Sequence, residues 1–152
     1  VGTLFIERGR RRAVHGVLHQ VAEHLHASDV VAVFPEGMIS PGDCLLPFHG
    51  NLVQAAISAS RPVVPVGLRY CNADGEPSAA MLYVGDMSFV GSVWRILGEP
   101  GLVAQLHVLD PIVTSRDDKR HLIAAQARDR LSQVLGLAQQ DTVPESLRNP
   151  TA

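Results

Sequence analysis

Charged side chains follow two apolar runs of the sequence, at the points where these runs end. Glu7 and Arg8 follow residues 2–6, and Pro-Glu-Gly at residues 35–37 follows the run DVVAVF at residues 29–34. In an open α/β sheet, ligands bind beyond the carboxyl ends of the parallel strands. If both runs are parallel strands, two carboxylates, an arginine and a glycine meet at one edge of the sheet. The alternative is an ordinary turn and a solvated strand end.

A cluster of arginines strengthens the case for an anion ligand at this edge. Residues 8–12 read RGRRR and open a predicted helix. Cations in the first turn of a helix oppose the helix dipole, so a sequence that keeps them there favours a bound anion. A phosphate group or an acidic lipid surface would serve. A solvated helix start is the alternative interpretation.

The elements that position these residues follow from the spacing of apolar side chains. Residues 10–27 predict an amphipathic helix between strands at 2–6 and 29–34, which makes a βαβ unit. The second run lacks alternation, as expected of a parallel strand covered on both faces. Pro35 then ends the pairing of that strand, and Gly37 lets backbone approach a ligand.

The rest of the sequence predicts further elements and a fold class. These are helices at 51–60 and 92–97, strands at 61–70, 81–84 and 102–109, and a final helix of about 20 residues. Ser115 and Asp118, spaced as in a capping box, precede that helix. We expect an α/β fold with a mainly parallel central sheet flanked by helices. Residues 1–137 form the predicted domain, and residues 138–152 a flexible tail.

Composition excludes several classes of function. The chain has 152 residues and a net charge of −2, so a nucleic-acid-binding role is not expected. Its two cysteines, Cys44 and Cys71, have no metal-ligand spacing and fit a reducing compartment. No run of the sequence approaches the roughly 18 apolar residues that span a bilayer. The first residues read as a strand without an initiator Met, so we expect a piece of a longer protein.

A histidine and an aspartate have the spacing of a catalytic pair at His24 and Asp29. They lie at the end of the first helix and the start of the second strand, which is the amino edge of the sheet. A strand of five residues at about 3.3 Å each separates them from Glu36 by roughly 17 Å. We therefore interpret His24 as a helix-terminal histidine, which the helix dipole favours.

Two other arrangements suggest chemistry less strongly. His15 and His19 are four residues apart on one helix, as zinc ligands can be, but no third ligand follows nearby, so no metal site is expected. Cys44 near His49 resembles a thiol nucleophile with a base. It lacks a third group to orient that base.

Three blocks of the sequence together resemble a known enzyme family. GTLFIERGRR resembles a motif in which Phe-Ile-Asp-Arg ends a strand, VFPEGMISPGDCLLPFHGNLVQAA resembles a Phe-Pro-Glu-Gly-Thr-Arg-Ser block, and PVVPV resembles a Val-Pro-Val block. In this order they are similar to the glycerolipid acyltransferases, typified by lysophosphatidic acid acyltransferase (1-acyl-glycerol-3-phosphate O-acyltransferase). The resemblance is close over roughly the first 70 residues and extends beyond them only in general layout.

The resemblance implies transfer of a fatty acyl group from acyl-CoA or acyl-ACP to the hydroxyl of a lysophospholipid, in phospholipid biosynthesis. No other cofactor and no metal is implied. In the family, a His followed five positions later by an Asp forms the catalytic pair, upstream of the first block. Only four residues precede Phe5, where the match to the Phe-Ile-Asp-Arg signature of that block begins. We therefore expect this chain alone to lack catalytic residues and turnover.

The resemblance also assigns site residues. The acceptor-binding residues it implies are Arg8, Glu36, Gly37, Met38 and Ser40, and the supporting residues are Glu7, Pro35 and Pro65.

Departures from the family pattern bear on the acceptor. Glu7 replaces an Asp and keeps the carboxylate, whereas Met38 and Ile39 replace Thr and Arg, and His49 replaces a frequent Lys. Ile39 cannot make the charge-assisted hydrogen bond to phosphate that the family's arginine is thought to make. Either Arg8 and its neighbours hold the phosphate, or the acceptor is another lysolipid, such as lyso-ornithine lipid. Met38 and Ile39 either line a lipid contact or pack against the next helix.

Location and the remaining alternatives complete the sequence-based expectations. The resemblance implies peripheral contact with an anionic membrane at its cytoplasmic face, through residues 8–12. From a different class, the chain could be a non-catalytic module that binds anionic lipid through the same arginines. A βαβ nucleotide-binding protein is disfavoured because no GxGxxG or Walker loop follows either early strand.

Overall fold

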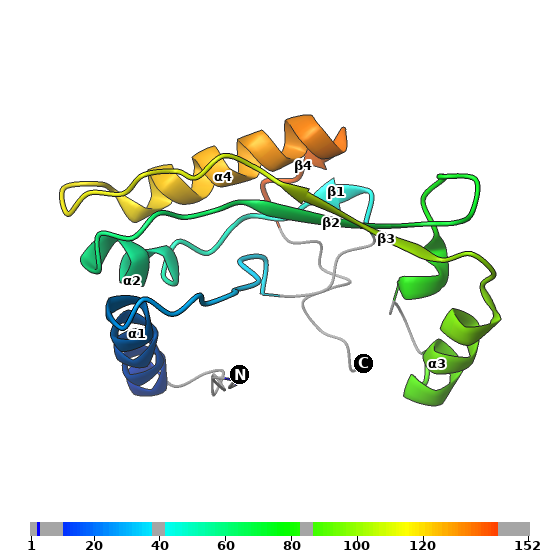
Figure 1. The fold of residues 1–152 in the computed structure, drawn as a ribbon, viewed down its shortest axis with the longest axis horizontal. Helices are drawn as coiled ribbons and strands as arrows, with labels where there is room; N and C mark the ends of the chain where they lie inside the picture. Colours follow the sequence, from blue (N-terminus) through cyan, green and yellow to red (C-terminus); the bar gives the residue numbers. More distant parts are fainter. Residues whose placement is uncertain (1–2, 4–10, 38–41, 83–86, 143–152) are drawn as a thin grey trace.

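The computed structural model describes residue 3 and residues 11–37, 42–82 and 87–142. Its elements are α1 (Arg11–His26), β1 (Cys44–Leu45), α2 (Val53–Ser58), β2 (Val66–Cys71), η1 (Ala79–Met81), α3 (Phe89–Gly98), β3 (Val103–Val108), α4 (Arg120–Leu135) and β4 (Ala138–Gln139). Figure 1 shows α4 lying along one side of β2 and β3. Helices α1 and α2 stand at one end of the molecule, and α3 stands at the other.

The strands form two small sheets rather than one mainly parallel sheet. β2 and β3 pair antiparallel over six residues each, from Val66 opposite Val108 to Cys71 opposite Val103. β1 and β4 pair in parallel over two residues each. The α/β class is confirmed, but the mainly parallel sheet is wrong for the described residues. The chain reverses between β2 and β3, which η1 and α3 separate, so β3 returns alongside β2 in the opposite direction.

The strand expected at residues 29–34 is absent from the structure. These residues have no strand assignment, and Val30 and Phe34 are 97% and 85% exposed. An apolar run becomes a buried strand only where neighbours supply hydrogen bonds and cover its faces. The expected neighbour at residues 2–6 lies, except for Thr3, outside the described residues, so the βαβ unit remains a prediction.

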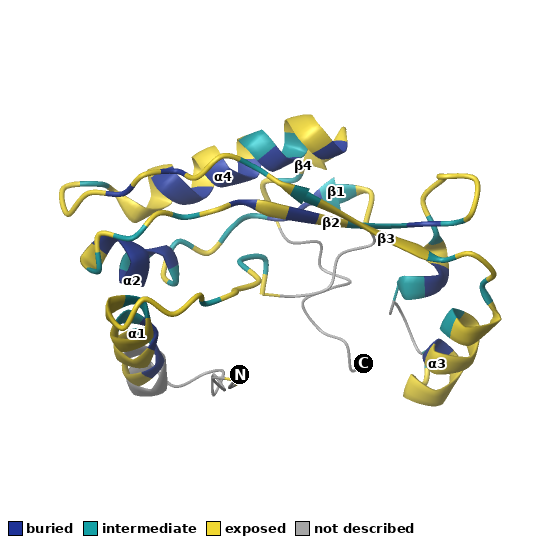
Figure 2. Ribbon diagram, viewed as in Figure 1, coloured by how far each residue is buried: buried dark blue, intermediate teal, exposed yellow. Residues whose placement is uncertain are grey.

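The main core lies where α4 meets α2 and the segments beside β2. It contains the buried side chains of Val53, Ile57, Ile112, Ile123, Ala124 and Ala127. Gly67 of β2 brings this strand close to α4, since a Cβ there would meet Leu135 at 3.1 Å and Leu131 at 3.3 Å. Figure 2 shows the resulting contrast between α4, which has a buried side, and α3, which is almost wholly exposed.

A second cluster attaches α1 to the rest of the chain. Val17 and Val21 pack with Ala55 of α2, and Leu18, Ala22, Leu25 and Val31 border them. The predicted helix at residues 10–27 is confirmed by α1, whose apolar residues recur at the spacing that places them on one side. None of the helices in the described part of the chain combines the length and apolarity needed to cross a membrane.

The later predicted elements are confirmed except for one strand. Helices at 51–60 and 92–97 correspond to α2 and α3, and strands at 61–70 and 102–109 to β2 and β3. Met81, where a strand was expected to begin, ends the short helix η1 instead. Residues 83–84 of that expected strand lie outside the described residues.

The final helix begins later than its capping signal suggests. The backbone N–H of Ser115 donates to the Asp118 carboxylate at 2.7 Å, which is one half of a capping box. Helix α4 nevertheless starts at Arg120, after Lys119, whose side chain makes no capping hydrogen bond. Asp118 therefore fixes the turn before the helix rather than its first turn.

Residues 138–141 belong to the folded structure. Ala138–Gln139 pairs with β1, and the backbone N–H of Gln140 donates to the Leu45 carbonyl at 3.0 Å. These contacts fall within the expected tail at 138–152, whose residues from 143 onward lie outside the described part. The division into a domain at 1–137 and a tail stays a prediction.

Candidate functional site

A tight turn presents the Pro-Glu-Gly residues at 35–37. The N–H of Gly37 donates to the Phe34 carbonyl at 3.3 Å, which places Pro35 and Glu36 at the two central positions. Gly37 has a φ of +71°, a conformation that L side chains rarely adopt, and a Cβ there would meet the His49 ring at 3.3 Å. Glycine at this position is therefore required by its backbone conformation and by the adjacent ring.

The segment after β1 is hydrogen-bonded to this turn. The backbone N–H of His49 donates to the Pro35 carbonyl at 2.8 Å, and the N–H of Leu46 donates to the Glu36 carboxylate at 3.4 Å. Leu46 is fully buried. Two backbone groups of residues 46–49 thus fix both the turn and the carboxylate that it carries.

Glu36 combines partial burial with a perturbed carboxyl group. Burial raises the pKa of Glu36 above its usual value, while the Leu46 N–H and the positive charge of Arg128 oppose that rise. A carboxyl group with a raised pKa is a stronger base once it is ionised. Such perturbed groups are common at functional sites, although structural networks produce them as well.

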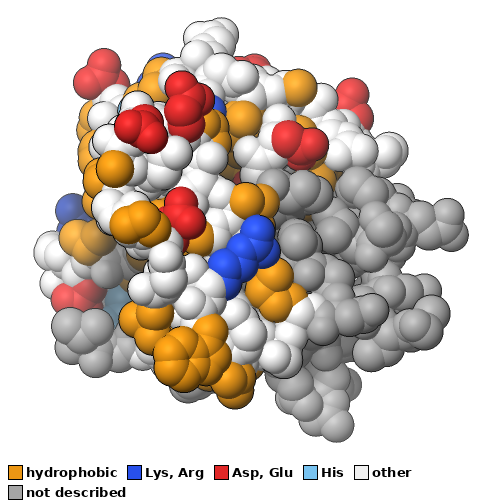
Figure 3. Space-filling view, turned by 90° about the vertical axis from the view of Figure 1, so that its right-hand side faces the viewer, with side chains coloured by type: hydrophobic (Ala, Val, Ile, Leu, Met, Phe, Trp, Pro, Cys, Tyr) orange, Lys and Arg blue, Asp and Glu red, His pale blue; other side chains and the backbone are white. Residues whose placement is uncertain are grey.

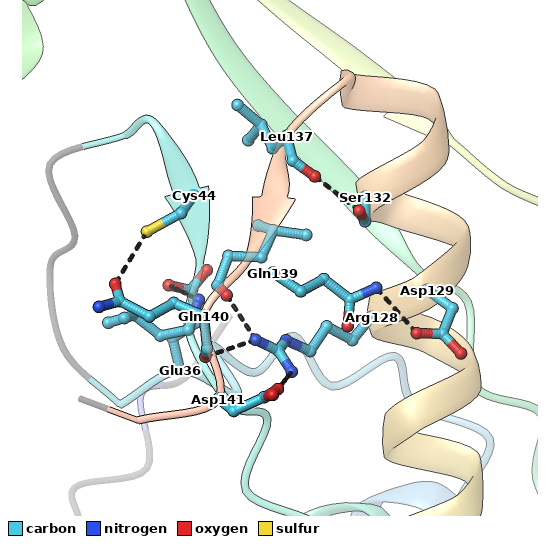
Figure 4. A network of polar contacts seen from close by, with 11 residues as sticks. Glu36, Cys44, Arg128, Asp129, Ser132, Leu137, Gln139, Gln140 and Asp141 are labelled. Atoms are coloured by element: carbon cyan, nitrogen blue, oxygen red, sulfur yellow. Dashed lines mark hydrogen bonds and ion pairs between the residues drawn. The ribbon is translucent and has the colours of Figure 1, made fainter.

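Arg128 of α4 is the centre of the polar network beside this turn (Figure 4). Its guanidinium donates to the carbonyls of Leu45 at 2.7 Å and Gln140 at 2.6 Å, and contacts Asp141 at 3.4 Å. The Arg128 side chain is buried, and its Nε has no partner among the described residues. One cation therefore joins β1, the segment after β4 and the helix that carries it.

Sequence reasoning missed Arg128, although the sequence held a signal. It stands four residues after Ala124 and three before Leu131, both of which are buried on the same side of α4. A cation on the apolar side of a helix must find partners for its N–H groups, because a buried unpaired charge is very costly. That position could have marked Arg128 as part of a buried network.

Cys44 is a poor candidate for a nucleophile. Burial raises the pKa of the Cys44 thiol, and the Asp43 side chain raises it further by a hydrogen bond and by its charge. The Sγ donates to Gln140 Oε1 at 3.3 Å. A thiol is reactive as the thiolate, so this environment keeps it in the unreactive form.

His24 and Asp29 are hydrogen-bonded, with Nδ1 and Oδ2 2.8 Å apart. The pair closes the end of α1: the Asp29 N–H donates to the His24 carbonyl, and Arg61 donates to the Leu25 carbonyl and the Ser28 hydroxyl. Both side chains are about half exposed, and their mutual contact joins residues five apart in sequence. The interpretation of His24 as a helix-terminal histidine stays a prediction that these contacts support.

The predicted site residues are described only in part. Pro35, Glu36 and Gly37 form the turn, and buried Pro65 accepts a hydrogen bond from the Leu109 N–H at 3.0 Å before β2 begins. The other predicted residues lie outside the described part of the chain: Glu7, Arg8, Met38, Ile39 and Ser40. Their convergence with Glu36 stays a prediction.

The described residues offer no evident metal site. They hold no group of three or more His, Cys, Asp or Glu side chains arranged to bind an ion. His19 contacts Glu23 at 3.6 Å, and the side chain of His15 is outside the described part.

Residues 1–69 match the family model described as Acyltransferase, and they include the Pro-Glu-Gly turn. These residues belong to the acyltransferase family. Part of the chain, 128 residues, is 37% identical to a lyso-ornithine lipid O-acyltransferase from Pseudomonas aeruginosa, covering 84% of this chain and 48% of that protein. The predicted resemblance to glycerolipid acyltransferases is confirmed.

Two further relatives are named as acyltransferases that act on 1-acyl-sn-glycerol-3-phosphate. A 1-acyl-sn-glycerol-3-phosphate acyltransferase from Neisseria gonorrhoeae is 33% identical over 147 residues, covering 97% of this chain and 51% of that protein. One from Escherichia coli is 39% identical over 66 residues, 43% of this chain and 27% of that protein. The chain thus spans about half the length of the first two relatives. No solved structure gives a significant match.

Proposed function

We propose that this chain is the acceptor-binding part of a glycerolipid O-acyltransferase that uses acyl-CoA or acyl-ACP. In the reaction, the acceptor hydroxyl oxygen forms an ester bond to the acyl carbon while the carbon–sulfur bond of the thioester breaks. The hydroxyl proton passes to a base and from that base to the sulfur, so the free thiol leaves. The observation that carries the proposal is a family-type Pro-Glu-Gly turn whose carboxylate is fixed by Leu46.

Glu36 is proposed to contact a hydroxyl or amine hydrogen of the lysolipid headgroup. A half-buried carboxylate held by a backbone N–H is a directional acceptor, and its partial desolvation strengthens a hydrogen bond that it receives. Arg8, Met38 and Ser40 would complete this acceptor site, with Gly37 allowing close approach of the backbone.

The test uses the encoding sequence extended upstream until it includes a His and an Asp five positions apart, beside the 152-residue chain alone. We expect acyl transfer from acyl-CoA by the extended protein and a blank-level rate from the chain alone. Turnover by the chain alone would contradict the predicted location of the catalytic pair.

A matched pair of variants tests the role of Glu36 in the extended protein. Glu36→Gln should raise the KM for the lysolipid severalfold or more and leave the KM for acyl-CoA unchanged, because only the acceptor contact is lost. Glu76→Gln, at an exposed position between β2 and η1, serves as the control. Equal kinetic constants for both variants would show that Glu36 does not contact the acceptor.

Two acceptors are candidates, 1-acyl-glycerol-3-phosphate and lyso-ornithine lipid, and both classes occur among the relatives. Ile39 favours the second acceptor, since it offers no donor for a phosphate. Rates with the two acceptors, measured for the extended protein and its Ile39→Arg variant, distinguish them. If the native acceptor lacks the phosphate, the added arginine should improve use of 1-acyl-glycerol-3-phosphate alone.

Peripheral contact with an anionic membrane at its cytoplasmic face belongs to the same proposal. The arginines among residues 8–12 would supply about 1 kcal/mol each near an anionic surface. Binding to anionic vesicles that weakens as salt rises, and that is reduced when these arginines are replaced by glutamine, would support this contact.

A further inference from the structure

Helix α3 exposes its apolar side chains and buries a small polar one. Its exposed apolar side chains, here called the α3 face, are Phe89, Val90, Val93, Trp94 and Leu97. Phe89, Trp94 and Leu97 are 75%, 70% and 71% exposed. The one buried residue of this fully described helix is Ser92, at 7%. This is the reverse of the pattern expected for a helix that packs on a core.

The α3 face is one continuous side of the helix. At 3.6 residues per turn, its five positions cover an arc of roughly 140°, and Arg95 falls on the opposite side. The helix contains this cation and no acidic residue. Aromatic and aliphatic side chains on one side, with a cation on the other, are typical of helices that lie in the interface of a membrane.

Both ends of α3 are fixed, so its exposure is not that of a frayed segment. The Ser88 hydroxyl accepts from the Gly91 N–H at 3.1 Å, which caps the first turn. At the other end, the Glu99 N–H donates to the Ile96 carbonyl, and the Glu99 side chain accepts from Ser78 at 3.3 Å. The helix is therefore capped at its start, joined to Ser78 at its end, and in contact with η1.

Apolar side chains are clustered on the surface at the α3 end of the molecule. Figure 3 views this end and shows apolar side chains grouped over its lower part, with a basic side chain beside them. Figure 1 shows α3 standing apart from α1, α2 and α4.

A second copy of the chain is a poor occupant for the α3 face. The five side chains of the α3 face offer roughly 600 Å² of accessible area, because an aromatic side chain contributes about 150–250 Å² when fully exposed and each of these is only partly exposed. Stable protein interfaces bury about 800 Å² on each partner. A lipid surface has no such minimum, because partitioning of each apolar side chain contributes separately.

We infer that the α3 face inserts into the interfacial region of a lipid membrane and so docks the protein on the surface where its substrate lies. The choice of lipid as the occupant rests on the proposed acyl transfer to a lysolipid. The contact is distinct from the electrostatic one expected of residues 8–12, because it depends on burial of apolar area and persists at high salt.

The single tryptophan of the chain, Trp94, reports this contact directly. We expect the 152-residue chain to show solvent-exposed tryptophan emission without lipid. With vesicles of phosphatidylglycerol and phosphatidylcholine, the emission should shift to shorter wavelength, and acyl chains brominated near the headgroup should quench it. Sedimentation with vesicles while the emission stays unchanged would overturn the inference, and so would a shifted emission in the absence of lipid.

Matched variants separate the α3 face from other exposed apolar residues. Phe89→Gln combined with Leu97→Gln should lower the vesicle partition coefficient at least about tenfold, because two large apolar side chains are removed. Val30→Gln combined with Val113→Gln removes two exposed side chains elsewhere and should change it little. Equal effects of the two pairs would overturn the inference. Circular dichroism checks that each variant keeps its helices.

The inference and the proposed function fail in different ways. Vesicle binding through Trp94 requires no turnover, so an extended protein without acyltransferase activity leaves the docking result unaffected. Conversely, activity on detergent-dispersed lysolipid without any change in Trp94 emission on vesicles would retain the proposed function and reject membrane docking by α3.

Discussion

Helices α3 and α4 depart from the rule that apolar residues lie inside, and they do so in opposite directions. Helix α4 buries Arg128 among Ala124, Ala127 and Leu131, whereas α3 exposes Phe89 and Trp94. The difference lies in what each helix can contact. Helix α4 packs on α2 and β2, and the carbonyls of Leu45 and Gln140 accept from its cation. Among the described elements, α3 closely meets only η1. Burial therefore reflects the available partner surface rather than the composition of the helix.

The largest expected effect comes from removing a buried leucine of α4 and comparing it with an exposed leucine of α3. Leu131→Ala should lower the free energy of unfolding by about 3 kcal/mol, because it opens a cavity between α4 and Gly67. The matched change on α3, Leu97→Ala, should alter stability by less than about 0.5 kcal/mol, since its side chain is exposed. Urea unfolding of the 152-residue chain measures both. A comparable loss in Leu97→Ala would mean that the α3 face is covered by protein.

The second effect compares the arginine of each helix, Arg128 on α4 and Arg95 on α3. Arg128→Met should cost about 2 kcal/mol, because the Gln140 carbonyl loses its Arg128 donor, whereas the Leu45 carbonyl still accepts from the Gln140 N–H. Arg95→Met on α3 should leave stability nearly unchanged, since Arg95 is exposed. The same unfolding measurements compare the two. If Arg128→Met proves neutral, the network in Figure 4 contributes no net stability.

The smallest expected effect is a pH dependence of stability that comes from the ionisation of Glu36, beside the Arg128 network. Because burial raises the pKa of Glu36 above its usual value of 4.5, the folded chain binds more protons than the unfolded chain between the two pKa values. The contribution of Glu36 to stability therefore falls as the pH rises through that window. Below 4.5 this contribution is unaffected.

Glu36→Gln removes this ionisation and retains an oxygen that can accept from Leu46. Its stability relative to the original chain should therefore rise between pH 4 and neutral pH, then become constant. Unfolding curves across that range measure the difference, with Glu76→Gln as the control. A difference that shrinks with rising pH would mean that Arg128, rather than burial, dominates the environment of Glu36.

The helices and the antiparallel strands were accessible to sequence reasoning, but the sheet topology was not. The spacing of apolar residues in α1 and α4 is periodic and local, so it specifies helices directly. The apolar run at residues 29–34 resembles a buried strand equally well, yet Val30 and Phe34 are exposed. A strand depends on partners distant in sequence, which a local pattern does not contain.

The candidate site was predictable to the same extent. The Pro-Glu-Gly turn follows from local residue preferences, with proline at its first central position and glycine after it. The groups that surround this turn do not follow from local residue preferences. Leu46, Arg128 and Gln140 are brought beside Glu36 by the pairing of β1 with β4 and by the packing of α4.

The helices, the tight turn and the membership of residues 1–69 in the acyltransferase family follow from the order of residues alone, since they depend on neighbouring residues or on ordered motifs. The burial of Arg128 and the exposure of the α3 face follow only from the packing of distant segments. Both outcomes depend on which surfaces the folded chain brings together, and the free energy of burying a side chain is set by those surfaces.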